Sequence, residues 1–136
     1  MDESAKKTAL RAIPYGIYVL TARADGDRLA AATVNWVTQC SFKPPLIAVG
    51  VKADSFAHGV VEESGSFVLN VLGKGQNDVA FAFFKSVEHD AATIGGYAYH
   101  PGTTGAPVLA DAIAHVDCRV TEIVRGGDHS LVVAEV

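Results

Sequence analysis

Few side chains in this sequence are arranged to act as nucleophiles, acids or metal ligands. No two of the five histidines lie four residues apart, and neither cysteine belongs to a Cys-x-x-Cys pair, so we expect no metal site. Gly-x-Ser-x-Gly and phosphate-loop motifs are missing, and Gly73 and Gly75 lack the third glycine of a dinucleotide fingerprint. The chemistry would then come from a bound cofactor, which the protein binds and orients.

Residues 52–55 combine features that suit a phosphate group. Lys52 supplies a full positive charge, and Ala53 leads into the turn. Ser55 lies where a helix should begin, and the free N–H groups and dipole of a helix start favour an anion. Asp54 is unfavourable beside a phosphate and is interpreted as a helix cap. Ser55 is a second candidate for that cap, and Gly65 is expected to end the helix. The alternative is an ordinary capped turn that binds nothing.

The elements that must position such groups are mainly strands joined as hairpins. We expect helices over residues 4–13, 55–64 and 77–84, and strands over 17–23, 28–38, 46–51, 67–72, 114 onward and 130–136. A slip in the alternation at Glu122 and Ile123 predicts a β-bulge. The long segment 86–105 indicates a functional loop, a partner contact or short hidden structure. Without regular strand–helix alternation, an antiparallel barrel with added helices is favoured.

Length and composition limit the possible classes of protein. A chain of 136 residues, 49% apolar and 19% charged, fits one globular domain over residues 1–136. The formal charge of −4 and the lack of a Lys/Arg run give nucleic-acid binding no support. No apolar stretch suits a signal peptide or a membrane helix, so we expect a cytoplasmic protein with Cys40 and Cys118 as free thiols. The sequence stops inside an apolar strand, so we also expect a further C-terminal piece.

Five motifs, in order, resemble the flavin-reductase family over about residues 8–136. Within that family the sequence looks most like the branch that includes flavoredoxin and the flavin domain of high-molecular-weight rubredoxin. The motifs are the strand Ala32-Thr33-Val34-Asn35-Trp36 with Ser41-Phe42-Lys43-Pro44-Pro45-Leu46, the turn Lys52-Ala53-Asp54-Ser55-Phe56, the strand Gly65-Ser66-Phe67-Val68-Leu69-Asn70-Val71-Leu72, Ala106-Pro107-Val108-Leu109 and Gly127-Asp128-His129.

The resemblance implies an antiparallel, Greek-key split β-barrel that binds FMN, with FAD as the alternative flavin, near a homodimer interface. It implies an NAD(P)H-dependent flavin oxidoreductase, in which hydride passes from nicotinamide to flavin N5. The second acceptor would be free flavin, oxygen or a redox partner protein such as rubredoxin or a monooxygenase component. The alternative is an FMN-containing electron carrier that serves a protein partner without nicotinamide turnover. A split barrel that binds haem or pyridoxal phosphate is a weaker alternative.

In this framework the edge of the flavin ring is expected along residues 33–36. Backbone groups of Thr33 and Val34 match its polar rim, the Asn35 amide both donates and accepts, and Trp36 offers a flat face. A core tryptophan beside an exposed asparagine is the alternative.

The remaining site residues are expected around the rest of the flavin and the nicotinamide. Ser41 and Phe42 would follow the ribityl side, and Asn70 would contact the cofactor or anchor its own strand. Phe84 would form a wall and Lys85 would assist the phosphate, with core packing and a solvated lysine as alternatives. His129, after a tight turn, would recognise nicotinamide or substrate rather than being a plain surface residue.

Overall fold

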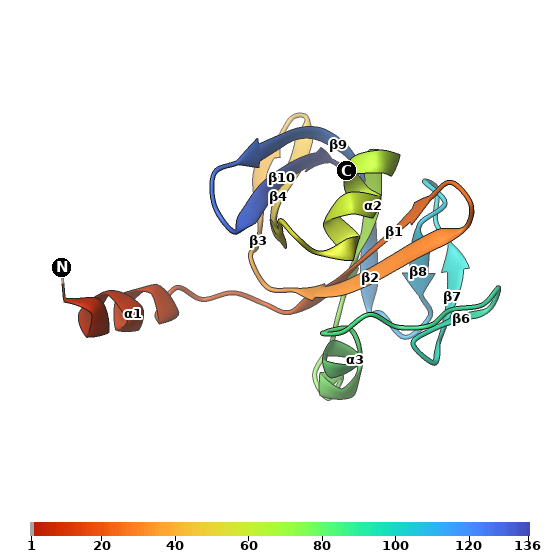
Figure 1. The fold of residues 1–136 in the computed structure, drawn as a ribbon, viewed down its shortest axis with the longest axis horizontal. Helices are drawn as coiled ribbons and strands as arrows, with labels where there is room; N and C mark the ends of the chain where they lie inside the picture. Colours follow the sequence, from red (N-terminus) through yellow and green to blue (C-terminus); the bar gives the residue numbers. More distant parts are fainter. Residues whose placement is uncertain (1) are drawn as a thin grey trace.

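The computed structural model describes residues 2–136 and consists mainly of antiparallel strands with short helices, as predicted (Figure 1). One sheet has seven strands in the order β2-β1-β5-β9-β10-β4-β3. Its strands are β1 (Tyr18–Ala24), β2 (Arg28–Val34), β3 (Val37–Phe42), β4 (Pro45–Lys52), β5 (Ser66–Val71), β9 (Ala114–Arg125) and β10 (His129–Glu135). A smaller sheet contains β6 (Thr93–Ile94), β7 (Tyr97–Pro101) and β8 (Pro107–Leu109). The helices are α1 (Glu3–Arg11), α2 (Phe56–Ser64) and α3 (Asn77–Ala82).

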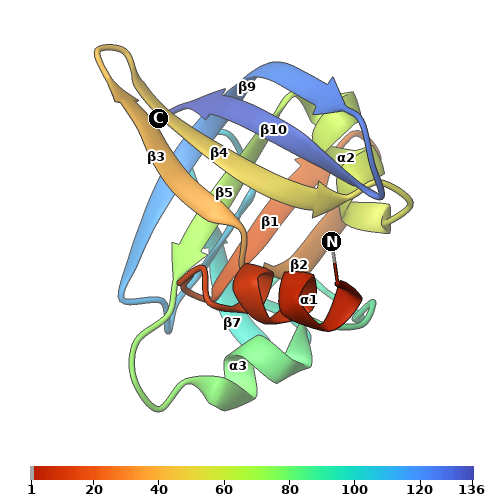
Figure 2. The same ribbon diagram turned by 90° about the vertical axis from the view of Figure 1, so that its left-hand side faces the viewer.

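The large sheet curls into an open barrel, with β2 and β3 as its two edge strands (Figure 2). Side chains from the inner face of most strands meet in one core, which includes Leu20, Val49, Phe67 and Val132. Because the β2 edge has no strand partner beyond it, its outer backbone groups remain open to other contacts. That edge positions the site described below.

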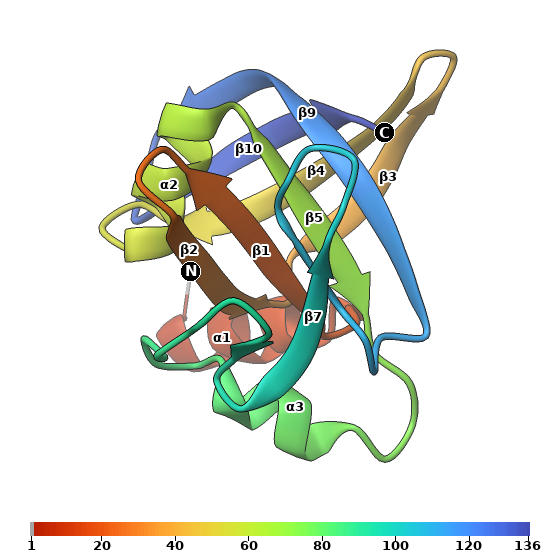
Figure 3. The same cartoon turned by 90° about the vertical axis from the view of Figure 1, so that its right-hand side faces the viewer.

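Helix α2 covers one end of the barrel (Figure 3). Val60 and Val61 are fully buried in the barrel core. Ser55 caps the helix start by accepting the N–H of His58, and Gly65 ends the helix at φ +72°, the left-handed conformation that glycine adopts without strain. The helix predicted over residues 55–64 is therefore confirmed.

The strand predicted over residues 28–38 is wrong as a single element. Asn35 and Trp36 interrupt it, because β2 and β3 lie at opposite edges of the sheet and the chain must cross between them. The predicted β-bulge is present but falls at Thr121, since Val133 pairs with Glu122 and Ala134 pairs with Val120. The pattern marked the irregularity one residue too late.

The long segment 86–105 contains β6 and β7, so the expectation of short hidden structure is confirmed. A second apolar cluster fixes this segment to the outer face of β1 and β2. It includes the buried side chains of Val19, Leu29, Phe83 and Ile94. The segment between α3 and β6 is thereby held beside the free edge of β2.

Helix α1 begins after Asp2, whose carboxylate accepts the N–H of Ala5, and none of its residues is buried. The helix was predicted to reach residue 13 but ends at Arg11. It projects from the barrel at the end of an extended segment (Figure 1). None of the helices within residues 2–136 has the length and apolar character needed to cross a membrane.

Candidate functional site

Two adjoining cavities lie along the free edge of β2. The smaller has a volume of about 230 Å³ and the larger about 550 Å³, which together lie in the range of cofactor sites. Five residues line both cavities and make them one groove: Ala32, Lys52, Ser55, Phe83 and Phe84. The smaller cavity is also lined by Thr33, Val34, Asn35 and His129, and the larger by Leu29, Ala31, Asp54, Phe56 and Lys85.

The floor of the groove is the outer backbone edge of β2. The Thr33 N–H points away from β1 and donates to the Phe83 carbonyl at 3.0 Å. In an antiparallel strand alternate residues turn their N–H and C=O to the same side, so those of Ala31 and Leu29 also face away from β1. Residues 30–32 in this floor are alanines, and their small side chains leave room for a ligand. Such an edge can bind the polar rim of a flat ring.

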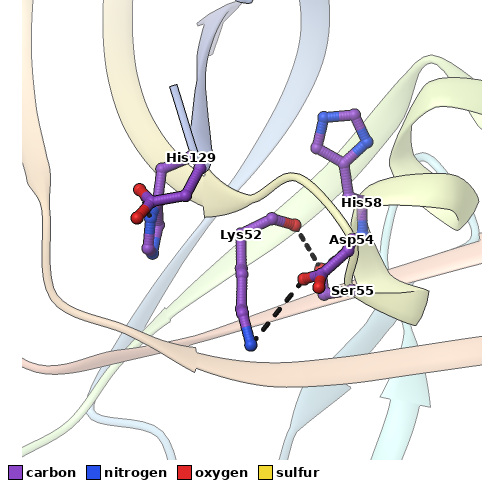
Figure 4. A network of polar contacts seen from close by, with 6 residues as sticks. Lys52, Asp54, Ser55, His58 and His129 are labelled. Atoms are coloured by element: carbon purple, nitrogen blue, oxygen red, sulfur yellow. Dashed lines mark hydrogen bonds and ion pairs between the residues drawn. The ribbon is translucent and has the colours of Figure 1, made fainter. Parts of the chain in front are cut away.

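The turn between β4 and α2 forms the cationic wall of the groove (Figure 4). Lys52 Nζ lies 3.7 Å from Asp54 Oδ1, and both groups are largely exposed. The Ser55 hydroxyl donates to the Lys52 carbonyl at 2.7 Å and accepts the His58 N–H at 3.1 Å. Ser55 is therefore the cap of α2, and the interpretation of Asp54 as the cap is wrong. The Ala53 N–H donates to the Asp128 carbonyl at 2.9 Å, which joins this turn to the β9–β10 turn.

His129 lies directly across from Lys52 on the neighbouring strand and lines the smaller cavity. Its Nδ1 is 2.9 Å from the Asp128 carboxylate, and the ring meets Trp36 edge-on with centroids 4.7 Å apart. The hydrogen bond from His129 lowers the pKa of the Asp128 carboxyl below its ordinary value. Trp36 packs behind His129 and over Gly50 and is not among the residues that line either cavity.

Aromatic residues also line the groove. Phe84 and Lys85 follow α3 and are exposed; Phe84 lines both cavities and Lys85 lines the larger one. Two aromatic residues that the sequence reasoning missed also line it: Phe56, 53% exposed at the start of α2, and the buried Phe83. Phe56 could have been found, because it directly follows the capping Ser55.

Five of the predicted residues line neither cavity of the groove: Trp36, Ser41, Phe42, Ala53 and Asn70. Ser41 and Phe42 belong to the β3–β4 hairpin, which extends away from the barrel (Figure 2), and line neither cavity of the groove. Asn70 is fully buried, so its assignment as a cofactor contact is corrected. Its amide nitrogen donates to the Val19 carbonyl and the Thr21 hydroxyl, and its oxygen accepts the Leu109 N–H at 2.9 Å. Asn70 therefore anchors the smaller sheet to the barrel.

Known proteins share both the sequence pattern and this architecture. Diflavin flavoprotein A 1 of Synechocystis sp. is 31% identical over all of this chain, which covers 24% of that protein. The NADH:FAD oxidoreductase of Streptomyces globisporus C-1027 is 28% identical, with a TM-score of 0.82 over 98% of this chain and 80% of that chain; it has also been solved with NAD and FAD fragments. The styrene monooxygenase flavin reductase of Pseudomonas putida S12 is 29% identical, with a TM-score of 0.80 over 95% of this chain and 81% of that chain.

These likenesses confirm the predicted split-barrel fold. The chain spans 24% and 21% of the length of two diflavin flavoproteins and 42% of the length of a probable flavin reductase of Rhizobium meliloti. The family described as "Flavin reductase like domain" matches residues 10–136. The chain belongs to this family of flavin reductase-like domains.

Proposed function

We propose that this chain binds the FMN portion of a flavin in the β2 groove and reduces it with NAD(P)H. The observation that carries the proposal is the order of groups along that groove. Asn35 and His129 line only the smaller cavity, and Lys85 lines only the larger one. Lys52 and Ser55 line both cavities and so lie where the two meet. A flavin has the same order, with a polar-rimmed ring at one end and a phosphate at the other.

The residues present fit such a group. Phe83 and Phe84 line both cavities and supply apolar walls, and the Asn35 amide can donate to and accept from the polar rim of the ring. Two lysines and the start of a nine-residue helix suit a phosphate. When bound, the isoalloxazine supplies the centre that accepts hydride from the nicotinamide and passes electrons to a second acceptor.

In this proposal His129 positions the nicotinamide at the mouth of the smaller cavity. The Nδ1–H of His129 donates to the Asp128 carboxylate, which fixes the ring orientation and leaves Nε2 free for a ligand. Trp36 packs against the ring edge and limits its rotation. His129 thus holds the co-substrate near the reacting centre, which is how binding geometry accelerates a transfer between two molecules.

We also propose that two copies associate through α1. A nine-residue helix is marginally stable in water unless it packs on something. Leu10 on α1 and Ile13 just after it are both 59% exposed. Changing both to glutamate should halve the mass measured by light scattering, whereas Lys7→Glu on the same helix should leave it unchanged. A wild-type monomer would contradict this proposal.

Equilibrium titration of the flavin-free protein tests the binding proposal directly. Quenching of flavin fluorescence should show saturable 1:1 binding of FMN and weaker binding of riboflavin, which lacks the phosphate. Asn35→Ala should lower the affinity for FMN and for riboflavin by a similar factor, because Asn35 lies at the end of the groove proposed for the ring that both ligands share. Absence of saturable binding of either ligand would contradict the proposed function.

A further inference from the structure

A third cavity, of about 410 Å³, continues the groove beyond its phosphate end. It meets the larger cavity at Leu29, which lines both. It is lined by residues of the β1–β2 hairpin, of the segment between α3 and β6, and of β7. Its other lining residues include Arg23, Asp27, His89, Tyr99 and Pro101. The three cavities follow one another along the edge of β2.

Flat and apolar surfaces form much of this third cavity. Leu29 is buried, and Tyr99 is half-buried with its hydroxyl held by the Asp90 carbonyl at 2.7 Å. That hydrogen bond fixes the ring, whose face remains a surface on which a base can stack. His89 is exposed and adds a second aromatic side chain. This chemistry suits a purine.

The charged groups Arg23, Asp27 and Asp90 around the third cavity already have hydrogen-bond or ion-pair partners. Arg23 Nη1 lies 2.8 Å from Asp27 Oδ1, and Arg23 Nε donates to the Gly105 carbonyl at 2.8 Å. The N–H groups of Ala92 and Thr93 donate to the Asp90 carboxylate and hold its pKa below its ordinary value. Because the Arg23 guanidinium already has these partners, the third cavity suits a neutral group better than a phosphate.

We propose that this third cavity binds the adenosine half of a dinucleotide whose phosphates lie at Lys52 and Lys85. The inference rests on the proposed function, because the flavin site fixes where the phosphates lie. The order along the groove would be ring, phosphates and adenosine. FAD and NAD(P)H both carry adenosine on a pyrophosphate, so the shared chemistry is an adenosine diphosphate group.

Two variants and one control test the third cavity. His89→Ala removes an exposed ring from the lining, and Ala91→Trp fills the space from another lining position. His100→Ala removes an equally exposed histidine from β7 outside this cavity. Fluorescence titration gives the Kd of FMN and of FAD for each protein. Calorimetry gives the Kd of NAD⁺ for the FMN-loaded protein, with no turnover.

If the adenosine belongs to FAD, wild-type protein should bind FAD about tenfold more tightly than FMN. His89→Ala and Ala91→Trp should remove most of that difference and leave the Kd of FMN within about twofold, since they do not touch the flavin end. If the adenosine belongs to NAD(P)H, FAD and FMN should bind with equal Kd values. Both variants should then raise the Kd of NAD⁺ by about tenfold.

Unchanged affinities for FAD and NAD⁺ in both variants, with normal FMN binding, would overturn this inference and leave the proposed function standing. An equal loss in His100→Ala would also overturn it, because the effect would not come from the cavity. Failure of wild-type protein to bind any flavin would overturn the proposed function, and this inference with it.

Discussion

The imidazole of His129 meets the indole of Trp36 edge-on, with ring centroids 4.7 Å apart and planes inclined at 60°. Trp36 lies just after edge strand β2, whereas His129 begins β10 on the other side of the groove. The contact therefore fixes the position of the His129 side chain, which lines the smaller cavity. It depends on Gly50, where a Cβ would lie 3.2 Å from both Cβ and Cε3 of Trp36.

Gly50→Ala should displace Trp36 and loosen its contact with His129. Overpacking of this kind lowers the free energy of unfolding by about 1–3 kcal/mol. Trp36 is the only tryptophan in the sequence, so its fluorescence reports both the displacement and a urea denaturation curve. Gly59→Ala is the matched control. A Cβ there meets nothing within 4 Å, and the helix should gain about 0.5–1 kcal/mol. Equal effects of the two changes would contradict this account.

Lys52→Ala should weaken FMN binding by about tenfold and leave riboflavin within about twofold. The reason is that Lys52 supplies charge to the phosphate end of the groove and has little to offer an uncharged ligand. Fluorescence titration with both ligands gives the ratio. Lys74→Ala, which removes an exposed lysine before α3, should change neither affinity. Equal losses for FMN and riboflavin would show that Lys52 does not act on the phosphate.

Asp128 should titrate below the ordinary value of 3.8, because the His129 imidazole donates a hydrogen bond to its charged form. A carboxyl whose pKa is lowered in the folded state stabilises that state above its unfolded pKa, and the contribution is lost as pH falls through the folded pKa. The pair should therefore persist from neutral pH to below pH 3.8 and break as the pH falls through the lowered pKa of Asp128. NMR of the carboxyl carbon gives the midpoint, which should rise toward 3.8 in His129→Ala. An unchanged midpoint in that variant would contradict the pairing.

Asn70→Ala should lower the free energy of unfolding by roughly 2–3 kcal/mol, because it leaves the buried Leu109 N–H without its acceptor and removes both hydrogen bonds that the Asn70 amide donates. Chemical denaturation measures the loss. Asn77→Ala, at the exposed start of α3, should stay within about 0.5 kcal/mol of wild type. Flavin affinity of the folded variant should be unchanged. A selective loss of flavin binding with normal stability would restore Asn70 to the cofactor site.

Much of the fold could be predicted because local rules agree with the tertiary structure. Alternation identified most strands, and Ser55 and Gly65 marked both ends of α2. The break at Asn35 could not be read from propensity, because it arises from the crossing between two sheet edges. The separation of Ser41 and Phe42 from the groove has the same origin: they follow that crossing and lie on the opposite edge strand.

The site was predicted in part for a similar reason. Lys52 and His129 are far apart in sequence but adjacent in register, and only the motif resemblance suggested that they belong together. Phe83 carried no signal beyond its apolar character, although it lines both cavities of the groove. Long-range strand pairing brings these residues together, and no local pattern encodes it.

Anaerobic stopped-flow reduction of the flavin-loaded protein by NADH and NADPH tests directly whether the bound flavin is reduced by a nicotinamide. We expect rapid bleaching of the visible flavin band with at least one of the two. In His129→Ala the reduction rate at low nicotinamide concentration should fall by about tenfold, with the flavin Kd within about twofold. A protein that holds its flavin tightly but is not bleached by either nicotinamide would contradict the account and would favour an electron carrier.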